Sequence, residues 1–394
     1  MRNTYIISEL FYPNKTSTAY IMTEIAKAIS VNKKINVITA DITYDKNIDD
    51  SKDLNLKNLI IHKTIKVDGN KNSIVTRLMN SIGVALSFGK FLSRKLRKGD
   101  TVFAVTNPFL LVIVLGLIRS FKKFKYVLLV HDVFPENAIP AGLMKKTSFQ
   151  YKFLKLLYDW SYSKADHKIV LGRDMYDLII NKSTKGKVHI IENWFDEDLN
   201  PDLNINRNNY LGVDVNDKIV IGFSGNIGRV QNIPKFIELF KKIKNPKLHF
   251  IIIGDGAEAE IIKSMISDND ISNITYIGPK PSNEQSLFLN CFDIGLITLS
   301  PGMKGLGVPS KTYNLLRMGK PILYIGDKNS EIDILVKENE IGWSTDWEDD
   351  NKLINLLNSI DSLNPVWIQN SKTIALNKYH HKIILEKFNT LLND

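Results

Sequence analysis

The sequence TYIISELFYPNKTSTAYIMTEIAKAISVNKKINVIT occupies residues 4–39 and sets the pattern for the rest of the chain. It starts with residues 4–8, a short run rich in β-branched and aromatic side chains that is typical of a strand. Over 19–30 the apolar residues recur at helical spacing, and a second β-branched run follows at 35–39. A strand, a helix and a strand in this order predict the βαβ unit of a parallel sheet.

The same alternation continues through the first half of the chain and restarts in the second. Further strands are expected at 58–62, 101–105, 126–130, 168–171 and 188–191, and then at 219–223, 248–253, 274–277, 294–296 and 322–324. The segment 193–217 between the two sets is rich in Asn and Asp and is the best linker candidate. We therefore predict an α/β fold with two Rossmann-like domains, whose strand ends face a shared cleft.

The expected domains are residues 1–197 and residues 198–372, and a final helix is expected at 373–392. With 44% hydrophobic and 24% charged residues, the chain has the composition of a globular protein, which argues against disorder. Its one cysteine, Cys291, excludes an internal disulfide and a Cys-rich zinc site. The longest apolar run, 109–118, is too short to span a bilayer, so a cytoplasmic location is expected.

Positive charge is concentrated in one part of the chain. The formal net charge is +10, and residues 51–150 alone hold 17 Lys and Arg against 5 Asp and Glu. A basic helix expected at 74–96, together with the lysines up to 125, could rest on an anionic membrane surface, or it could simply be a solvated helix face. A nucleic-acid partner is not expected, because the cations accompany no recognisable nucleic-acid-binding module.

Three loops of the second half have features suited to phosphate binding. The loop SGNIGR at 224–229 follows an expected strand, has glycines that permit close backbone approach and offers the guanidinium of Arg229. The loop GDG at 254–256 also follows a strand, and the loop GLGVPSK at 305–311 places the ammonium of Lys311 at the start of an expected helix. An ordinary turn remains an alternative for each loop, and most of all for 254–256.

The first half contributes the loop HDVFPE at 131–136, directly after an expected strand. The imidazole of His131 could contact a substrate hydroxyl, or it could form a structural pair with Asp132. No metal site is expected, because His380 and His381 would point about 100° apart on a helix.

Taken together, these motifs resemble glycosyltransferase family 4, the retaining nucleotide-sugar enzymes of GT-B fold, over nearly the whole chain. The likeness is greatest to the bacterial capsule, O-antigen and exopolysaccharide branch, including fucosaminyltransferase-like members. The motifs are ELFYP at 9–13, TNPF at 106–109, HDVFPE at 131–136, ENW at 192–194, SGNIGR at 224–229, GDG at 254–256, PSKTY at 309–313 and GKP at 319–321.

The resemblance implies a role for each matching residue. It implies that His131, Arg229 and Lys311 are catalytic and that no metal or other cofactor is needed. It also implies that the terminal segment 373–394 crosses back to the first domain. The implied donor-binding residues are Gly225, Asn226, Gly254, Asp255, Gly256, Pro309, Ser310 and Asn314. The residues implied on the acceptor or sugar side are Thr18, Asn107, Asp132 and Glu136.

The chain departs from the family pattern at three places. The acidic pair of the family, spaced by seven residues, is replaced by Leu306 and Asn314. The first loop, usually rich in glycine, has the sequence KTSTA at 15–19. The basic residue that commonly follows the arginine has only a loose counterpart in Lys235.

The resemblance predicts transfer of a sugar from a nucleoside diphosphate donor, expected to be UDP-linked, to a lipid-linked saccharide in surface polysaccharide biosynthesis. The expected location is the inner face of the cell membrane. A nucleotide-sugar 2-epimerase of the same fold is the alternative, although it would need carboxylates near the sugar for proton transfer. A nucleic-acid-binding protein is a more remote alternative.

Overall fold

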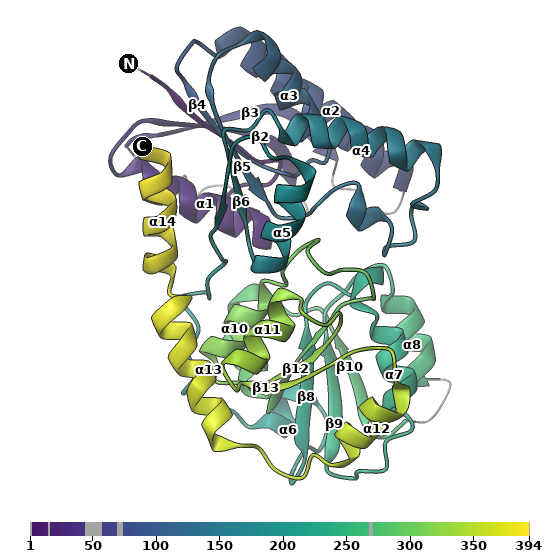
Figure 1. Ribbon diagram of the computed structural model, residues 1–394. Coiled ribbons are helices and arrows are strands. Elements are labelled where there is room, and N and C mark those ends of the chain that lie inside the picture. Colours follow the sequence, from purple (N-terminus) through teal and green to yellow (C-terminus); the bar gives the residue numbers. More distant parts are fainter. Residues whose placement is uncertain (1, 15, 44–56, 69–73, 268–270, 394) are drawn as a thin grey trace.

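The computed structural model describes residues 2–14, 16–43, 57–68, 74–267 and 271–393, and it has two α/β domains (Figure 1). The first is built on a seven-stranded sheet of order β3-β2-β1-β4-β5-β6-β7, in which every pairing is parallel. Its strands are β1 (Thr4–Ile7), β2 (Ile35–Thr43), β3 (Leu59–Asp68), β4 (Thr101–Val105), β5 (Lys125–Val130), β6 (His167–Val170) and β7 (Lys187–Ile190). The prediction of a parallel sheet is therefore confirmed.

Helices cover both faces of this sheet, because right-handed crossovers in opposite directions along a sheet leave their helices on opposite faces. The connections from β3 to β6 place α2, α3 and α4 side by side, whereas the connection from β1 to β2 places α1 on the other face. The helices of this domain are α1 (Ser17–Ser30), α2 (Ile74–Lys95), α3 (Leu111–Phe121), η1 (Glu136–Ala138), α4 (Phe149–Tyr162) and α5 (Arg173–Lys182).

The second domain has a six-stranded, all-parallel sheet of order β10-β9-β8-β11-β12-β13. Its strands are β8 (Ile219–Ser224), β9 (Leu248–Ile253), β10 (Ile274–Gly278), β11 (Ile294–Thr298), β12 (Ile322–Ile325) and β13 (Gly342–Thr345). Strand β13 was not predicted, because its short sequence GWST has no β-branched run. The helices are α6 (Arg207–Leu211), η2 (Arg229–Gln231), α7 (Ile233–Phe240), α8 (Ala259–Ser267), η3 (Ser282–Glu284), α9 (Gln285–Asn290), α10 (Lys311–Arg317), α11 (Glu331–Glu338) and α12 (Asp350–Asn358).

The C-terminal segment consists of two helices, so the prediction of one helix over 373–392 was wrong. Helix α13 (Pro365–Lys378) packs on α10, and α14 (His381–Asn393) packs on α1 of the first domain. The chain leaves the helical path at Tyr379, whose ring is buried and lies 4.8 Å from the ring of Tyr313. Figure 1 shows the two yellow helices passing from the second domain to the first, as the family resemblance implied.

Direct contacts also join the two domains beside the crossover. The guanidinium of Arg173 forms ion pairs with Glu331 at 3.0 Å and with Glu338 at 2.7 Å. The buried carboxylate of Asp174 accepts the backbone N–H groups of Gly305 at 2.9 Å and Glu331 at 3.1 Å. The domains are thus held together on one side of the cleft. Over the described residues, no helix has both the length and the apolar character that crossing a bilayer requires.

Candidate functional site

A cleft of about 1110 Å³ lies between the domains at the carboxyl ends of both sheets. It brings together most of the residues that the sequence predicted. The predicted residues that line it are Thr18, His131, Asp132, Gly225, Asn226, Gly254, Asp255, Pro309, Ser310, Lys311 and Asn314. Four predicted residues are not among those that line it, namely Asn107, Glu136, Arg229 and Gly256.

Lys311 is the most unusual charged group in the cleft. Its ammonium is buried, has no hydrogen-bond partner within the described part of the chain, and lies 3.6 Å from the centroid of the Phe223 ring. Burial lowers the pKa of Lys311 from 10.5 to about 7. The ring face offsets part of the cost of burying the charge. An ammonium held in this way is available to an anion that enters the cleft.

His131 faces the same cleft from the first domain. Its backbone N–H donates to the hydroxyl of Thr106 at 3.2 Å, as does that of Asp132 at 3.3 Å. Its Nε2 is buried and has no hydrogen-bond partner in the described chain. Burial lowers the pKa of His131 to about 4, so the imidazole is neutral at physiological pH. A neutral imidazole can donate a hydrogen bond to a sugar hydroxyl or accept one from it, and no charge has to be buried.

The loops after β8 and β9 meet so closely that only glycine fits between them. Gly254 has a φ of +152°, and a Cβ atom added there would lie 1.9 Å from the carbonyl oxygen of Gly225. A Cβ added at Gly225, whose φ is +123°, would lie 3.7 Å from Nζ of Lys311. These glycines therefore keep the two loops in contact next to the lysine; Gly225 is exposed to the cleft, whereas Gly254 is buried.

Arg229 lies in η2, where its side chain is exposed and is not part of the cleft lining. Its charge acts on Glu258, whose pKa is raised by burial and lowered in part by the charge of Arg229. The two residues next along the chain, Val230 and Gln231, do line the cleft. The predicted catalytic role of Arg229 stays a prediction.

Glu136 lies in a cluster of ion pairs away from the cleft lining. Its carboxylate lies 2.6 Å from the ammonium of Lys182, which is buried, and 3.3 Å from the ammonium of Lys155, which is partly exposed. Lys182 also pairs with Asp159 at 2.7 Å. The contacts tie η1 to α4 and α5, which gives Glu136 a structural role in addition to any contact with a sugar.

Asn314 occupies the place of the second acidic residue of the family. Its Oδ1 accepts the backbone N–H of Asp196 at 2.9 Å, so its amide nitrogen is the group left to meet a ligand. Lys235, the loose counterpart of the missing basic residue, pairs with Asp350 at 3.0 Å and does not line the cleft.

Several cleft residues were missed by the sequence analysis. Helix α1 presents Tyr20, Glu24 and Lys27 to the cleft, and the segment after β7 adds Trp194 and Asp196. The signal for the α1 residues was their spacing of three or four, which places them on one side of a helix whose apolar side is buried. Trp194 belongs to the motif ENW at 192–194 but was given no role in the site, and Asp196 has no comparable signal because it lies in a segment predicted to be a linker.

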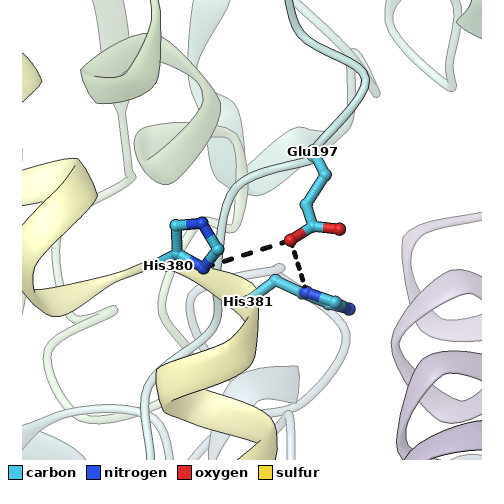
Figure 2. A group of neighbouring side chains, drawn as sticks. All are labelled: Glu197, His380 and His381. Carbon is cyan, nitrogen blue, oxygen red and sulfur yellow. Dashed lines mark ion pairs between the residues drawn. The ribbon is translucent and has the colours of Figure 1, made fainter.

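The two crossings between the domains meet at a small ionic cluster of Glu197, His380 and His381 (Figure 2). The carboxylate of Glu197 lies 2.7 Å from Nδ1 of His381 and 4.0 Å from Nδ1 of His380. The expectation that both histidines lie within one helix was wrong, because His380 precedes α14. Nδ1 of His380 accepts the backbone N–H of Lys382 at 3.2 Å, which occupies the lone pair of the His380 nitrogen that lies toward Glu197.

Comparison with known proteins shows the family. Residues 212–372 match the family model described as "Glycosyl transferases group 1". The probable glycosyltransferase WbjE of Pseudomonas aeruginosa is 36% identical over 325 residues, which are 81% of this chain and 80% of that protein. The chain is a group 1 glycosyltransferase. This glycosyltransferase is also 23% identical, over 270 residues and 66% of each protein, to the putative colanic acid biosynthesis glycosyl transferase WcaI of Escherichia coli K12.

Solved structures share its GT-B fold over nearly their full length. Sucrose-phosphate synthase of Thermosynechococcus elongatus superposes with a TM-score of 0.74 at 12% identity, covering 100% of this chain and 98% of the other. HepE of Anabaena in complex with UDP gives 0.71 at 15% identity and 100% coverage of both. WaaG, a glycosyltransferase involved in lipopolysaccharide biosynthesis, gives 0.69 at 10% identity and 99% coverage of both. Membership in this transferase family does not favour the 2-epimerase alternative.

Proposed function

We propose that this glycosyltransferase transfers a sugar from a UDP-sugar to a lipid-linked saccharide, with retention at the anomeric carbon, in the synthesis of a surface polysaccharide. The observation that carries the proposal is the buried ammonium of Lys311 in the cleft lining, which has no hydrogen-bond partner among the described residues. A buried cation of this kind is suited to a diphosphate whose charge grows as the glycosidic bond breaks.

The choice of UDP is supported by solved structures of the same fold. The HepE structures contain UDP and UDP-glucose. In the present chain, the exposed Gly225 lines the cleft next to Lys311, and a Cβ added there would lie 3.7 Å from Nζ. We propose that the diphosphate lies over Gly225 beside Lys311 and that the amide nitrogen of Asn314 donates to a hydroxyl of the donor.

In the proposed reaction, the bond between the sugar and the diphosphate breaks while the oxygen of the acceptor hydroxyl attacks the anomeric carbon from the same face, and the proton of that hydroxyl passes to the departing diphosphate. Lys311 stabilises the departing diphosphate, and Arg229 would join it if its exposed side chain turned toward the donor. Neutral His131 hydrogen-bonds the transferred sugar. Protein cations, rather than a divalent metal or a cofactor, carry the electrostatic stabilisation in this scheme. Closure of the domains excludes water, which disfavours hydrolysis of the donor.

For the acceptor side, we propose a lipid-linked saccharide that reaches the first domain at the inner face of the cell membrane. The names of the relatives support a role in polysaccharide synthesis, since WcaI is described as a colanic acid enzyme and WaaG as a lipopolysaccharide enzyme. The basic residues between 74 and 125 would meet anionic lipid headgroups, at about 1 kcal/mol for each nearby cation. Lys90 and Arg94 on α2 are exposed, whereas the side chain of Arg77 lies outside the described residues.

The test is a panel of nucleotide-sugars, followed by turnover with a lipid diphosphate saccharide. Binding of each donor is measured by calorimetry, and the anomeric configuration of the product is read by NMR. We expect a UDP-sugar to bind and the product to keep the configuration of the donor. An inverted product, or binding only of donors with another base, would contradict the corresponding part of the proposal.

A further inference from the structure

Helix α4 carries two apolar stripes, and packing in the core accounts for only one of them. Tyr151, Tyr158 and the rest of the inner stripe are buried. The second stripe consists of Phe149, Phe153 and Leu156, which are 78%, 54% and 73% exposed. These positions follow the spacing i, i+4, i+7 and therefore lie along one outer side of the helix.

The exposed stripe is ordered as well as apolar. The rings of Phe149 and Phe153 are stacked, with centroids 6.2 Å apart and planes at 12°. Leu143, in the segment that leads from the cleft to the helix, is 59% exposed. A chain of this size normally exposes such side chains singly, so a cluster of this kind indicates a surface that is covered in use.

The charges around the stripe indicate what covers it. Residues 137–158 contain four lysines and no acidic residue. Lys145, Lys146 and Lys152 have exposed side chains, and none of them pairs with a carboxylate within the described part of the chain. Two copies meeting through this surface would bring like charges together. An apolar stripe with a basic border instead matches a bilayer that contains anionic lipids.

The position of the stripe fits this partner. Helix α4 packs beside α3, and α3 packs beside α2, so the stripe continues the layer that carries the basic residues 74–125. On α3 the ring of Phe121 is 87% exposed, next to Lys122 and Lys123. The segment before α4 begins near Pro140, which approaches Gly302 of the second domain, and the next residue, Met303, lines the cleft.

We propose that the outer stripe of α4, formed by Phe149, Phe153 and Leu156, inserts into an anionic bilayer and holds the cleft at the membrane. The inference rests on the proposed function only because a lipid-linked acceptor would require the enzyme to act at the membrane surface. It differs from the contact proposed for α2 because apolar insertion, rather than charge alone, supplies the binding.

Insertion can be read with a fluorophore, because the sole cysteine, Cys291, is buried. A solvatochromic label is attached at Phe153→Cys and, as a control, at Ile261→Cys, a residue of α8 that is 51% exposed. With vesicles of phosphatidylcholine and phosphatidylglycerol, we expect a blue shift at position 153 and none at 261. The absence of a shift at 153 would overturn the proposal.

Vesicle flotation supplies the second measurement. Phe149→Ser with Phe153→Ser should lower partition onto these vesicles about tenfold or more, because two apolar side chains no longer enter the bilayer. Ile261→Ser should leave partition unchanged. Partition of the double variant equal to that of the unaltered enzyme would refute insertion. So would a dimer, seen by light scattering, that the same variant abolishes, since the stripe would then belong to a second copy.

Turnover with a water-soluble acceptor analogue separates this inference from the proposed function. The double variant should retain full turnover in solution and lose it only with acceptor in vesicles. If no donor supports turnover in any variant, the proposed function fails whatever the flotation result. If turnover is normal and the variants do not affect flotation, only the proposal that the stripe inserts into the bilayer fails, and the proposed function stands.

Discussion

Binding of UDP should be accompanied by uptake of a proton on Lys311. The ammonium is buried, and its pKa is lowered to about 7 because burial disfavours the charged form. At pH 8 about 0.9 of these side chains are therefore neutral in the empty enzyme. A diphosphate in contact with the nitrogen favours the charged form, so binding should take up close to one proton at pH 8. At pH 6 the lysine is already charged, and the uptake should fall to about 0.1 of a proton.

The same shift has a consequence for stability. The pKa of Lys311 is about 7 in the folded enzyme against 10.5 when unfolded. Between these values the unfolded chain binds more protons, so the free energy of unfolding rises with pH by at most about 1.4 kcal/mol per unit. Lys311→Met removes this dependence. At pH 8 this substitution should raise the free energy of unfolding of the empty enzyme by at most about 3 kcal/mol. The gain is limited because the contact with the Phe223 ring already offsets part of the cost of burying the lysine.

The assay is calorimetry of UDP binding in buffers with different ionisation enthalpies, at pH 6 and pH 8. The slope of enthalpy against buffer enthalpy gives the number of protons taken up. For Lys311→Met we expect no uptake, an affinity about 10- to 100-fold lower, and a higher midpoint of thermal unfolding without ligand. Enthalpies that do not depend on the buffer at pH 8 would refute the reasoning. An unchanged affinity of the Met variant would refute the contact with the diphosphate.

Four other outcomes follow from the contacts of single residues. His131→Ala should lower kcat about 100-fold with little change in KM, and kcat/KM of the unaltered enzyme should show no inflection near pH 6.5 from this ring, since its pKa is about 4. Gly254→Ala should cost about 3 kcal/mol or more in chemical denaturation, because the added Cβ meets a carbonyl oxygen, whereas Gly212→Ala, with nothing within 4 Å, should cost only about 1 kcal/mol. Arg173→Ala should leave a buried carboxylate of the second domain unpaired, destabilise by about 3 kcal/mol, and increase the radius of gyration measured by X-ray scattering. Glu136→Gln should lower the thermal midpoint and leave KM for the acceptor unchanged if its ion pairs are its main role, and a raised KM would instead favour the acceptor-side prediction.

Much of the fold was predictable because parallel strands are buried on both faces and leave continuous apolar runs. Strand β9 is buried along its whole length and was predicted with the bounds 248–253 that the structure shows. Strand β13 lies at the edge of its sheet. A strand there is less buried and needs fewer apolar residues, so its sequence shows no clear pattern and the strand was missed. The break at Tyr379 was also missed, because helical spacing alone does not record that the ring packs into the second domain.

The candidate site was predictable where a loop follows a buried strand, since that position alone brings a residue to the carboxyl edge of the sheet. This explains why His131, Gly225 and Gly254 all line the cleft. The direction of a side chain does not follow from its position, because a loop residue can point along the edge of the sheet as well as into the cleft. Arg229 lies in the expected loop but is exposed outside the lining, and the sequence of the loop does not indicate that orientation.

The replacement at Asn314 changes where negative charge lies in the cleft. An acidic residue there would accept the N–H of Asp196 and still carry a charge toward the donor, whereas the amide satisfies the same N–H and offers a neutral donor group. The carboxylate of Asp196 remains in the lining, and burial is the main cause of its raised pKa. Negative charge in this part of the cleft therefore comes from Asp196, in the segment that joins the domains, and from Glu24 on α1, rather than from α10.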